Sequence, residues 1–298
     1  MIYQHPLAYL IGLEGIALMR AWSGDFDKEF VLARLAEVRR LLDDDALTNH
    51  PGVDVASADT LTGYGQWAPT YDEPNTLFDV DEPVMHELLH ALPAGAALDA
   101  ACGTGRYAKY LVERGHHVIG VDSSPDMLVM ARRNVPHAEF RLGELERLPL
   151  DDGSVDLVVS GLALAHAPSL VPVMVEFARV LRPGGHLVIS DTHHDLVFRG
   201  SLVKSRGPEG EPGIVRTYRH TPGDFLRAAL PVGLQVRRCE EPGRLAREVQ
   251  DASTPVEMQI TIGEWQDWPW SLLGVAPDAT RTAWEISGAI VWHFQLDR

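Results

Sequence analysis

The sequence predicts an α/β fold with a mostly parallel sheet, and three observations lead to this prediction. From residue 96 onward, short apolar segments alternate with amphipathic helical segments, which is the pattern of βαβ units. A run of small residues that includes Gly103 and Gly105 follows the first expected strand and opens a helix. The 298 residues are 45% hydrophobic and 23% charged, as in ordinary globular domains.

Charge and cysteine content exclude several functional classes. With 42 acidic and 26 basic residues, the net charge of −16 repels nucleic-acid phosphates and anionic lipids, so we expect neither partner. Cys102 and Cys239 form no CxxC pair, which favours a reduced, cytoplasmic compartment. The apolar run at residues 7–19 is interrupted by Glu14 and is too short and too polar to span a membrane.

The first 60 residues read as a helical extension and a linker. Apolar residues recur at helical spacing over residues 6–42, which predicts two amphipathic helices with Ser23 or Asp25 capping the second. Residues 43–63 lack useful periodicity and are expected to form a linker. The two helices would either form a homodimer contact or cover the ligand site.

The main domain is expected at residues 61–298. Strands are predicted at 96–100, 117–121, 138–141, 155–160, 186–190, 234–239 and 289–296, and helices at 106–114, 125–133, 170–181 and 222–229. Residues 195–216 form a turn-dense insertion. Residues 241–285 are too many for a hairpin loop, so we expect a lid inserted before the last strand.

The glycine run leaves more than one ligand open. Residues 103–108 satisfy the GxGxxA form of a dinucleotide fingerprint, and Asp122 lies 19 residues after Gly103, near the spacing of a ribose-binding acid. A nicotinamide-dependent oxidoreductase is therefore one interpretation. A non-catalytic cofactor-binding module is another, although its loop would be damaged and this loop is intact.

Several ordered motifs separate these interpretations. They are YGQWAPTYD at 64–72, LDAACGTG at 98–105, VIGVDSSPDML at 118–128, GELERLPL at 143–150, VDLVVS at 155–160 and LRPGGHL at 181–187. As a set they resemble the S-adenosylmethionine-dependent methyltransferases of the Rossmann-like class, in their small-molecule, natural-product branch. The resemblance implies a Rossmann-like seven-stranded sheet and disfavours the oxidoreductase.

The resemblance implies S-adenosylmethionine as the cofactor and assigns residues to it. The residues expected to bind it are Tyr71, Asp99, Ala101, Gly103, Gly105, Asp122, Ser123, Met127, Glu144, Leu145 and Ser160. Asp122 would accept both ribose hydroxyls, because a carboxylate has two oxygens. Asp99 would face the ammonium of the methionine part, and Glu144 and Leu145 would flank the adenine with Met127 packed on the ring. Ala101 and Glu144 depart from the glycine and aspartate that the family often has there.

Three residues after the expected strands are candidates for proton chemistry. His166 matches a histidine that recurs beside the transferred methyl in natural-product methyltransferases; the alternative is a structural histidine that caps the next helix. Asp191 and His193 follow another strand and are predicted catalytic on position, against the alternative of ordinary strand-end polar residues. His193 and His194 lack a third ligand at a recognisable spacing, so no metal is expected.

The aromatic residues of the lid and of residues 64–67 predict an aromatic methyl acceptor. The lid contains Glu264, Trp265 and Trp268, and we expect its tryptophans to stack on a substrate, although core packing would explain one or two of them. Tyr64 and Trp67 are also expected at the substrate. The predicted function is methylation of a small aromatic or indole-like metabolite at carbon, nitrogen or oxygen.

Overall fold

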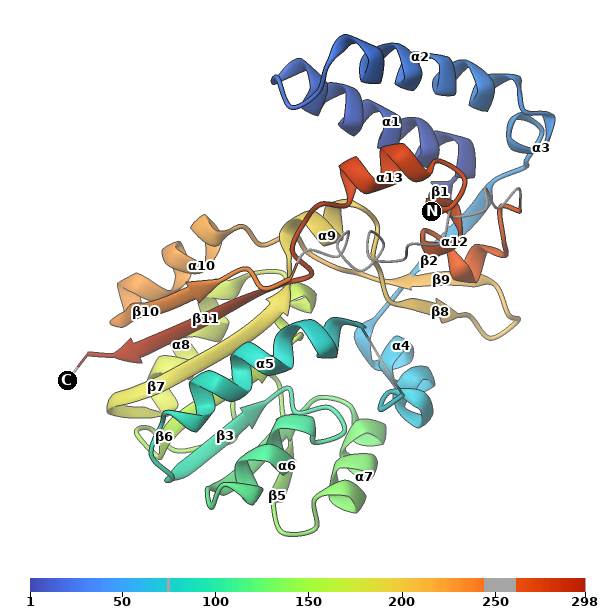
Figure 1. The fold of residues 1–298 in the computed structure, drawn as a ribbon. Helices are drawn as coiled ribbons and strands as arrows, with labels where there is room; N and C mark the ends of the chain where they lie inside the picture. The colour runs from blue at the N-terminus through green and yellow to red at the C-terminus, as the bar shows by residue number, and fades with distance from the viewer. Residues whose placement is uncertain (74–75, 244–260, 298) are drawn as a thin grey trace. The chain divides into compact units, whose positions relative to one another are not determined.

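Figure 1 shows the computed structural model of the chain, which describes residues 1–73, 76–243 and 261–297. The chain divides into two compact units. The first unit comprises Met1–Ser57, Val203–Ile214 and Gly243–Ile286, and the second comprises Ala58–Leu202, Val215–Pro242 and Ser287–Arg298. The sequence-based boundary near residue 60 lies close to the first junction, whereas residues 203–214 and residues 261–285 of the predicted lid fall in the unit of the N-terminal helices.

The second unit is built on a seven-stranded sheet with the order β10-β11-β7-β6-β3-β4-β5. Its strands are β3 (Ala96–Ala100), β4 (His117–Asp122), β5 (Glu139–Leu142), β6 (Val155–Gly161), β7 (Leu181–Thr192), β10 (Leu234–Glu240) and β11 (Ala289–Leu296). Strands β5, β4, β3, β6 and β7 run parallel, while β11 pairs antiparallel with both β7 and β10. The predicted α/β fold with a Rossmann-like seven-stranded sheet is confirmed.

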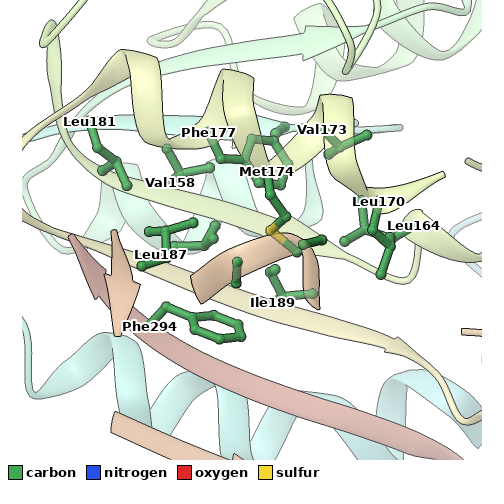
Figure 2. Close-up of a cluster of buried hydrophobic side chains, with 14 of the residues drawn as sticks. Val158, Leu164, Leu170, Val173, Met174, Phe177, Leu181, Leu187, Ile189 and Phe294 are labelled. Carbon is green, nitrogen blue, oxygen red and sulfur yellow. The ribbon is translucent and has the colours of Figure 1, made fainter. Parts of the chain in front are cut away.

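Alternating side chains on these strands cover both faces of the sheet. Leu187 and Ile189 belong to one buried cluster, and Val188 between them belongs to the other, as the period of two requires. The first cluster is completed by α8 (Leu170–Val180) and α10 (Pro222–Ala229). Figure 2 shows the α8 side chains, Phe177 among them, against the strands. The second cluster is completed by α5 (Thr76–His90), α6 (Arg106–Glu113) and α7 (Pro125–Asn134).

Capping residues mark the first turns of α7 and α10 at the positions that the sequence predicts. The Ser124 hydroxyl accepts from the Met127 N–H at 3.3 Å, and Pro125 occupies the first helical position of α7. Thr221 and Asp224 form a capping box at α10. Helix α5 is absent from the sequence-based elements. Its internal Pro83 argues locally against a helix, and the burial of its apolar side chains on the sheet outweighs that signal.

The first unit combines helices with a small sheet. Its helices are α1 (Pro6–Trp22), α2 (Lys28–Asp43), α3 (Asp45–Thr48), α12 (Trp270–Leu273) and α13 (Pro277–Ala283), with a 3-10 turn η4 (Trp265–Asp267). The two predicted amphipathic helices match α1 and α2. The predicted cap is wrong, because Asp27 caps α2 by accepting from the Phe30 N–H at 2.9 Å.

Two segments expected to lack regular structure contain strands and helices. Residues 43–63 hold α3, β2 (Val53–Ala58) and the start of α4 (Thr60–Trp67), and residues 195–216 hold most of α9 (His194–Phe198) with β8 (Lys204–Arg206) and β9 (Pro212–Val215). With β1 (Ile2–Gln4), these strands form a sheet of order β1-β2-β9-β8. Strands β1, β8 and β9 have only three or four residues, too few for alternation to be recognised locally.

A buried ion pair joins the helices of the first unit. Glu14 on α1 is fully buried and accepts from Arg34 on α2 at 3.0 Å, and Arg34 also pairs with Asp278 on α13 at 2.9 Å. Burial raises the pKa of Glu14 to about 7, although the Arg34 charge opposes that shift. Among the residues that the structure describes, no helix has the length and apolar character needed to cross a bilayer.

Candidate active site

A cavity of about 830 Å³, open mouth included, lies in the second unit at the carboxyl ends of β3, β4 and β6. In open α/β sheets this edge is where ligands bind. Of the predicted site residues, those that line it are Tyr64, Tyr71, Ala101, Gly103, Asp122, Ser123, Met127, Glu144, Leu145 and His166. The cavity therefore brings together residues that are more than 100 positions apart in the sequence.

The glycine loop between β3 and α6 lines this cavity with its backbone. Gly103 and Gly105 have φ angles of +54° and +93°, in the region that favours glycine. Ala101 also has a positive φ of 55°, which is strained for a residue with a side chain. A Cβ built on Gly103 meets only the Tyr71 ring, at 3.9 Å, so the loop leaves open space for a ligand.

Asp122 joins the glycine loop to the start of α7. One carboxylate oxygen accepts from the Gly103 N–H at 2.8 Å and the other accepts from the Ser124 N–H at 2.8 Å. Burial raises the pKa of this carboxyl, while the backbone N–H groups that it accepts from oppose the shift. The carboxylate also accepts from the Ser123 N–H and keeps acceptor capacity beyond these three bonds, so Asp122 can accept from a ligand hydroxyl.

Asp99, Gly105 and Ser160 do not line the cavity. The Asp99 carboxylate is 1% exposed and accepts from the Ala108 N–H at 2.7 Å, inside the first turn of α6. Burial raises its pKa to about 7. Ser160 is fully buried with an unpartnered hydroxyl. In the structure, Asp99 therefore fastens the helix behind the glycine loop, and its predicted contact with the ammonium stays a prediction.

An aromatic cluster at α4 and the following turn flanks the cavity. Tyr64, Trp67 and Tyr71 have ring centroids 4.9–6.2 Å apart. Tyr64 and Tyr71 line the cavity, and Trp67 packs behind them. The carboxylate of Asp72 accepts from the Thr104 hydroxyl at 2.5 Å and so ties this segment to the glycine loop.

His166 lies in the short turn η2 (Leu164–His166) after β6, with both ring nitrogens engaged. Nδ1 lies 3.1 Å from the Arg216 carbonyl oxygen and therefore carries the proton. Nε2 then accepts from the Tyr64 hydroxyl at 2.7 Å. Burial lowers the pKa of His166, so the neutral ring dominates at pH 7. The site thus holds an imidazole poised to accept a proton.

Asp191 and His193 lie outside the cavity lining and support neighbouring elements. The Asp191 carboxylate is 1% exposed and accepts from the Ala165 N–H at 3.1 Å, which holds the turn that carries His166. Burial raises its pKa to about 7. His193 accepts from the Asp195 N–H at 3.2 Å through Nδ1 and caps α9. Their catalytic roles stay predictions; these contacts indicate positioning.

The structure places Asp195 beside His193 and His194. The sequence-based prediction did not include this carboxylate as a third metal ligand. Ligand atoms of His193, His194 and Asp195 lie within 4.8 Å of one another. However, His193 Nδ1 accepts from a backbone N–H, so its proton lies on Nε2, which leaves that nitrogen no lone pair for a metal. The geometry is therefore that of a helix cap.

The predicted lid residues belong to the first unit. Trp265 and Trp268 are 9% and 6% exposed, and their indole N–H groups donate to Gln4 at 2.7 Å and to the Ile262 carbonyl at 3.2 Å. The Lys204 ammonium donates to the carbonyls of both. Packing accounts for these two indoles, and their stacking on a substrate stays a prediction, as does the role of Glu264. Residues 244–260 of the expected lid lie outside the described residues.

Some lining residues escaped sequence reasoning. Thr60 and Leu61 begin α4 and line the cavity, in a segment expected to be a linker. Asp59, which caps α4 by accepting from the Thr62 N–H at 2.7 Å, was the available signal. Leu162 also lines the cavity, with a positive φ of 55° that no sequence pattern indicates.

Comparison with known proteins agrees with this site. Residues 98–189 match the family described as "Methyltransferase domain". This stretch of the chain is therefore similar to a methyltransferase domain, and it lies within the Rossmann-like sheet. The S-adenosylmethionine-dependent class, which the motifs resemble, uses S-adenosylmethionine as its cofactor. Asp122, Gly103, Glu144 and Leu145 all line the cavity, and their contacts with the ribose, methionine and adenine parts stay predictions.

Sequence relatives align with this chain over only part of their own length. A malonyl-[acyl-carrier protein] O-methyltransferase of Pectobacterium atrosepticum is 32% identical over 170 residues, covering 56% of this chain and 64% of that protein. An uncharacterized methyltransferase of Mycobacterium tuberculosis is 46% identical over 125 residues, covering 41% and 51%. The chain thus spans less than two thirds of either relative.

Solved structures share the fold. The PH0226 protein from Pyrococcus horikoshii superposes with a TM-score of 0.52 and 20% identity, covering 77% of this chain and 96% of that one. The [4+2]-cyclase SpnF gives a TM-score of 0.51 and 17% identity, covering 83% and 99%. A cyclase on the same fold means that the reaction has to be argued from the site.

Proposed function

We propose that this protein transfers a methyl group from S-adenosylmethionine to a small aromatic or indole-like metabolite, at an acceptor atom that carries a proton. The observation that carries the proposal is the position of His166. A neutral imidazole lies in the same cavity as Asp122 and the glycine loop, and it is hydrogen-bonded to a tyrosine hydroxyl. A base beside a methyl-donor site suits acceptors with O–H or N–H groups.

The residues of the cavity divide the work of the reaction. S-adenosylmethionine supplies an electrophilic methyl group on a sulfonium. Asp122 and the loop around Gly103 hold the cofactor, and the rings of Tyr64 and Tyr71 form a wall of the cavity. With the cofactor bound, the acceptor atom would bond to the methyl carbon, and the leaving thioether would keep the electron pair of the S–C bond. The acceptor proton leaves at the same stage.

Tyr64 and His166 form the route for that proton. The Tyr64 hydroxyl already donates to His166 Nε2, so its oxygen accepts the proton of the acceptor while its own proton passes to the imidazole. The Arg216 carbonyl, which accepts from Nδ1, stabilises the imidazolium that results. Asp191 acts indirectly by fixing the turn that carries His166.

Incubation with S-adenosylmethionine and a panel of phenols, indoles and aromatic amines tests the proposal, read by mass spectrometry as a one-methylene gain. We expect His166→Ala to lower turnover by about 100-fold, the typical contribution of a general base, with cofactor-product binding unchanged. His137→Ala, at an exposed histidine outside the cavity lining, is the matched control. Normal turnover of His166→Ala would return this histidine to a structural role.

A nicotinamide-dependent oxidoreductase and a non-catalytic binding module are the alternatives. The first would bind NADH in place of S-adenosylhomocysteine. The second would bind S-adenosylhomocysteine and yield no methylated product. The same panel, combined with a binding measurement for both ligands, separates all three.

A further inference from the structure

The charged side chains of the described residues that line the cavity are all acidic. Its charged side chains among the described residues are the carboxylates of Asp122, Glu144 and Glu146, and no lysine or arginine of the described chain lines it. Thr60, Leu61 and Leu162 also line the cavity and carry no charge. An anionic acceptor would leave water for a cavity in which no described lysine or arginine side chain pairs with it, which is unfavourable.

The backbone around His166 offers little compensation to an anion. The N–H of Leu162 donates to the Ser190 carbonyl at 2.8 Å, and that of Ala165 donates to Asp191 at 3.1 Å. The N–H groups of His166 and Ala167 donate to carbonyls of the same turn at 3.1 and 2.9 Å. These donors are satisfied within the protein, so the turn does not form an anion-binding nest.

The nearby cations are also engaged elsewhere. Arg106 pairs with Asp81 through two hydrogen bonds of 2.9 and 3.0 Å and with Glu82. Arg216 turns its carbonyl toward His166, while its guanidinium lies over the Tyr218 ring at 5.1 Å. Neither guanidinium lines the cavity.

We infer that the acceptor group in this cavity is uncharged, a neutral aromatic O–H or N–H compound without carboxylate or phosphate on the reacting ring. This inference rests on the proposed function and narrows its substrate class. It also separates this site from the malonyl relative named above, because a malonyl group carries a free carboxylate. Leu61, which is 47% exposed and lines the cavity, is the specificity-determining position that we assign.

A matched pair of acceptors tests the inference. Para-hydroxybenzamide and para-hydroxybenzoate have nearly the same shape and differ in charge. The ratio of their kcat/KM values for methyl-ether formation therefore measures the effect of the acceptor's charge. We expect the parent protein to favour the amide by about tenfold or more. Leu61→Arg should shift the ratio toward the benzoate by about tenfold, because a guanidinium pairs with a carboxylate, and the uncharged control Leu61→Gln should leave it near the parent value.

Each outcome has a distinct meaning. Equal or better use of the benzoate by the parent, or methylation of the carboxylate of malonyl-pantetheine, overturns the inference while leaving methyltransferase activity intact. An unchanged ratio in Leu61→Arg overturns the assignment of Leu61. Absence of product from both aromatic probes and from the wider panel, with S-adenosylhomocysteine still bound, overturns the proposed aromatic acceptor, and the inference falls with it.

Discussion

Ala101 is the residue in the glycine loop whose backbone conflicts most with its side chain. Its φ of 55° costs a residue with a Cβ about 1 kcal/mol, and glycine escapes that cost. We expect Ala101→Gly to raise the free energy of unfolding by about 1 kcal/mol or slightly less, since glycine also gains freedom in the unfolded chain. Urea denaturation followed by circular dichroism measures this. A clear loss of stability would mean that the Ala101 methyl group packs favourably enough to outweigh the strain.

The pH dependence of turnover follows from His166. Burial lowers its pKa below the usual 6.5, so the neutral base is present at pH 7 and is lost only as the pH falls through that lowered value. We expect kcat/KM to be flat from pH 7 to about 6.5 and to fall below it, and this acid limb should vanish in His166→Ala. A limb centred above pH 7 in the parent would contradict the assignment of His166 as the base.

At the scale of elements, the packing of Trp265 gives the sharpest test of the lid hypothesis. The indole is 9% exposed and its N–H donates to Gln4 within the first unit. We expect Trp265→Ala to cost about 3–5 kcal/mol of stability through a cavity and an unpaired amide oxygen. Trp270→Ala, at a 52% exposed indole, should cost much less. A stability loss below 1 kcal/mol in Trp265→Ala, together with weakened acceptor binding, would instead support the lid hypothesis.

The sequence predicted the elements that build the parallel sheet and missed those whose stability depends on distant contacts. The strand that became β3 matches its predicted bounds at 96–100, because four of its five residues are apolar, as is typical of a buried parallel strand. Strand β1 has three residues and exists only through pairing with β2, about 50 positions away, so local patterns carry no trace of it.

In the candidate site too, local motifs predicted which residues follow the strands but not where every side chain points. The glycine loop, Asp122 and Glu144 follow strands in recognisable motifs, and the sheet brings their carboxyl ends to one edge. Asp191 carries the same strand-end signal, yet its carboxylate turns to the Ala165 N–H, because a buried acid has to be hydrogen-bonded. The direction in which a side chain points is set by tertiary contacts that a single sequence does not display.

At the scale of the whole molecule, buried carboxyls predict an unusual pH dependence of stability. Burial raises the pKa values of Glu14, Asp99 and Asp191 to about 7, so the folded state holds their protons more tightly than the unfolded state does. Their contribution is fully present below about pH 4 and is lost as the pH rises through 7. Histidines with lowered pKa values, among them His166 and His293, act in the opposite sense until the pH is well above 6.5, so the carboxyl contribution has to be isolated by substitution.

We therefore expect each such carboxyl to lower the free energy of unfolding between pH 6.5 and 8 by on the order of 1 kcal/mol, measured as the difference between the parent and the variant that lacks it. Denaturant titrations across this range measure the slope. Asp191→Asn should reduce the slope, because its amide does not titrate, while Asp126→Asn, at an exposed acid, should leave it unchanged. Equal slopes in the parent and in Asp191→Asn would contradict the raised pKa of this carboxyl.

The central claim is that the cavity beside Asp122 binds S-adenosylmethionine and its product. Isothermal titration of the whole protein with S-adenosylhomocysteine and with NADH tests it most directly. We predict saturable binding of S-adenosylhomocysteine and none of NADH, with a loss of about tenfold or more in Asp122→Ala and no change in the control Asp126→Ala. Tighter binding of NADH, or equal affinity of the parent and Asp122→Ala for S-adenosylhomocysteine, would contradict the claim.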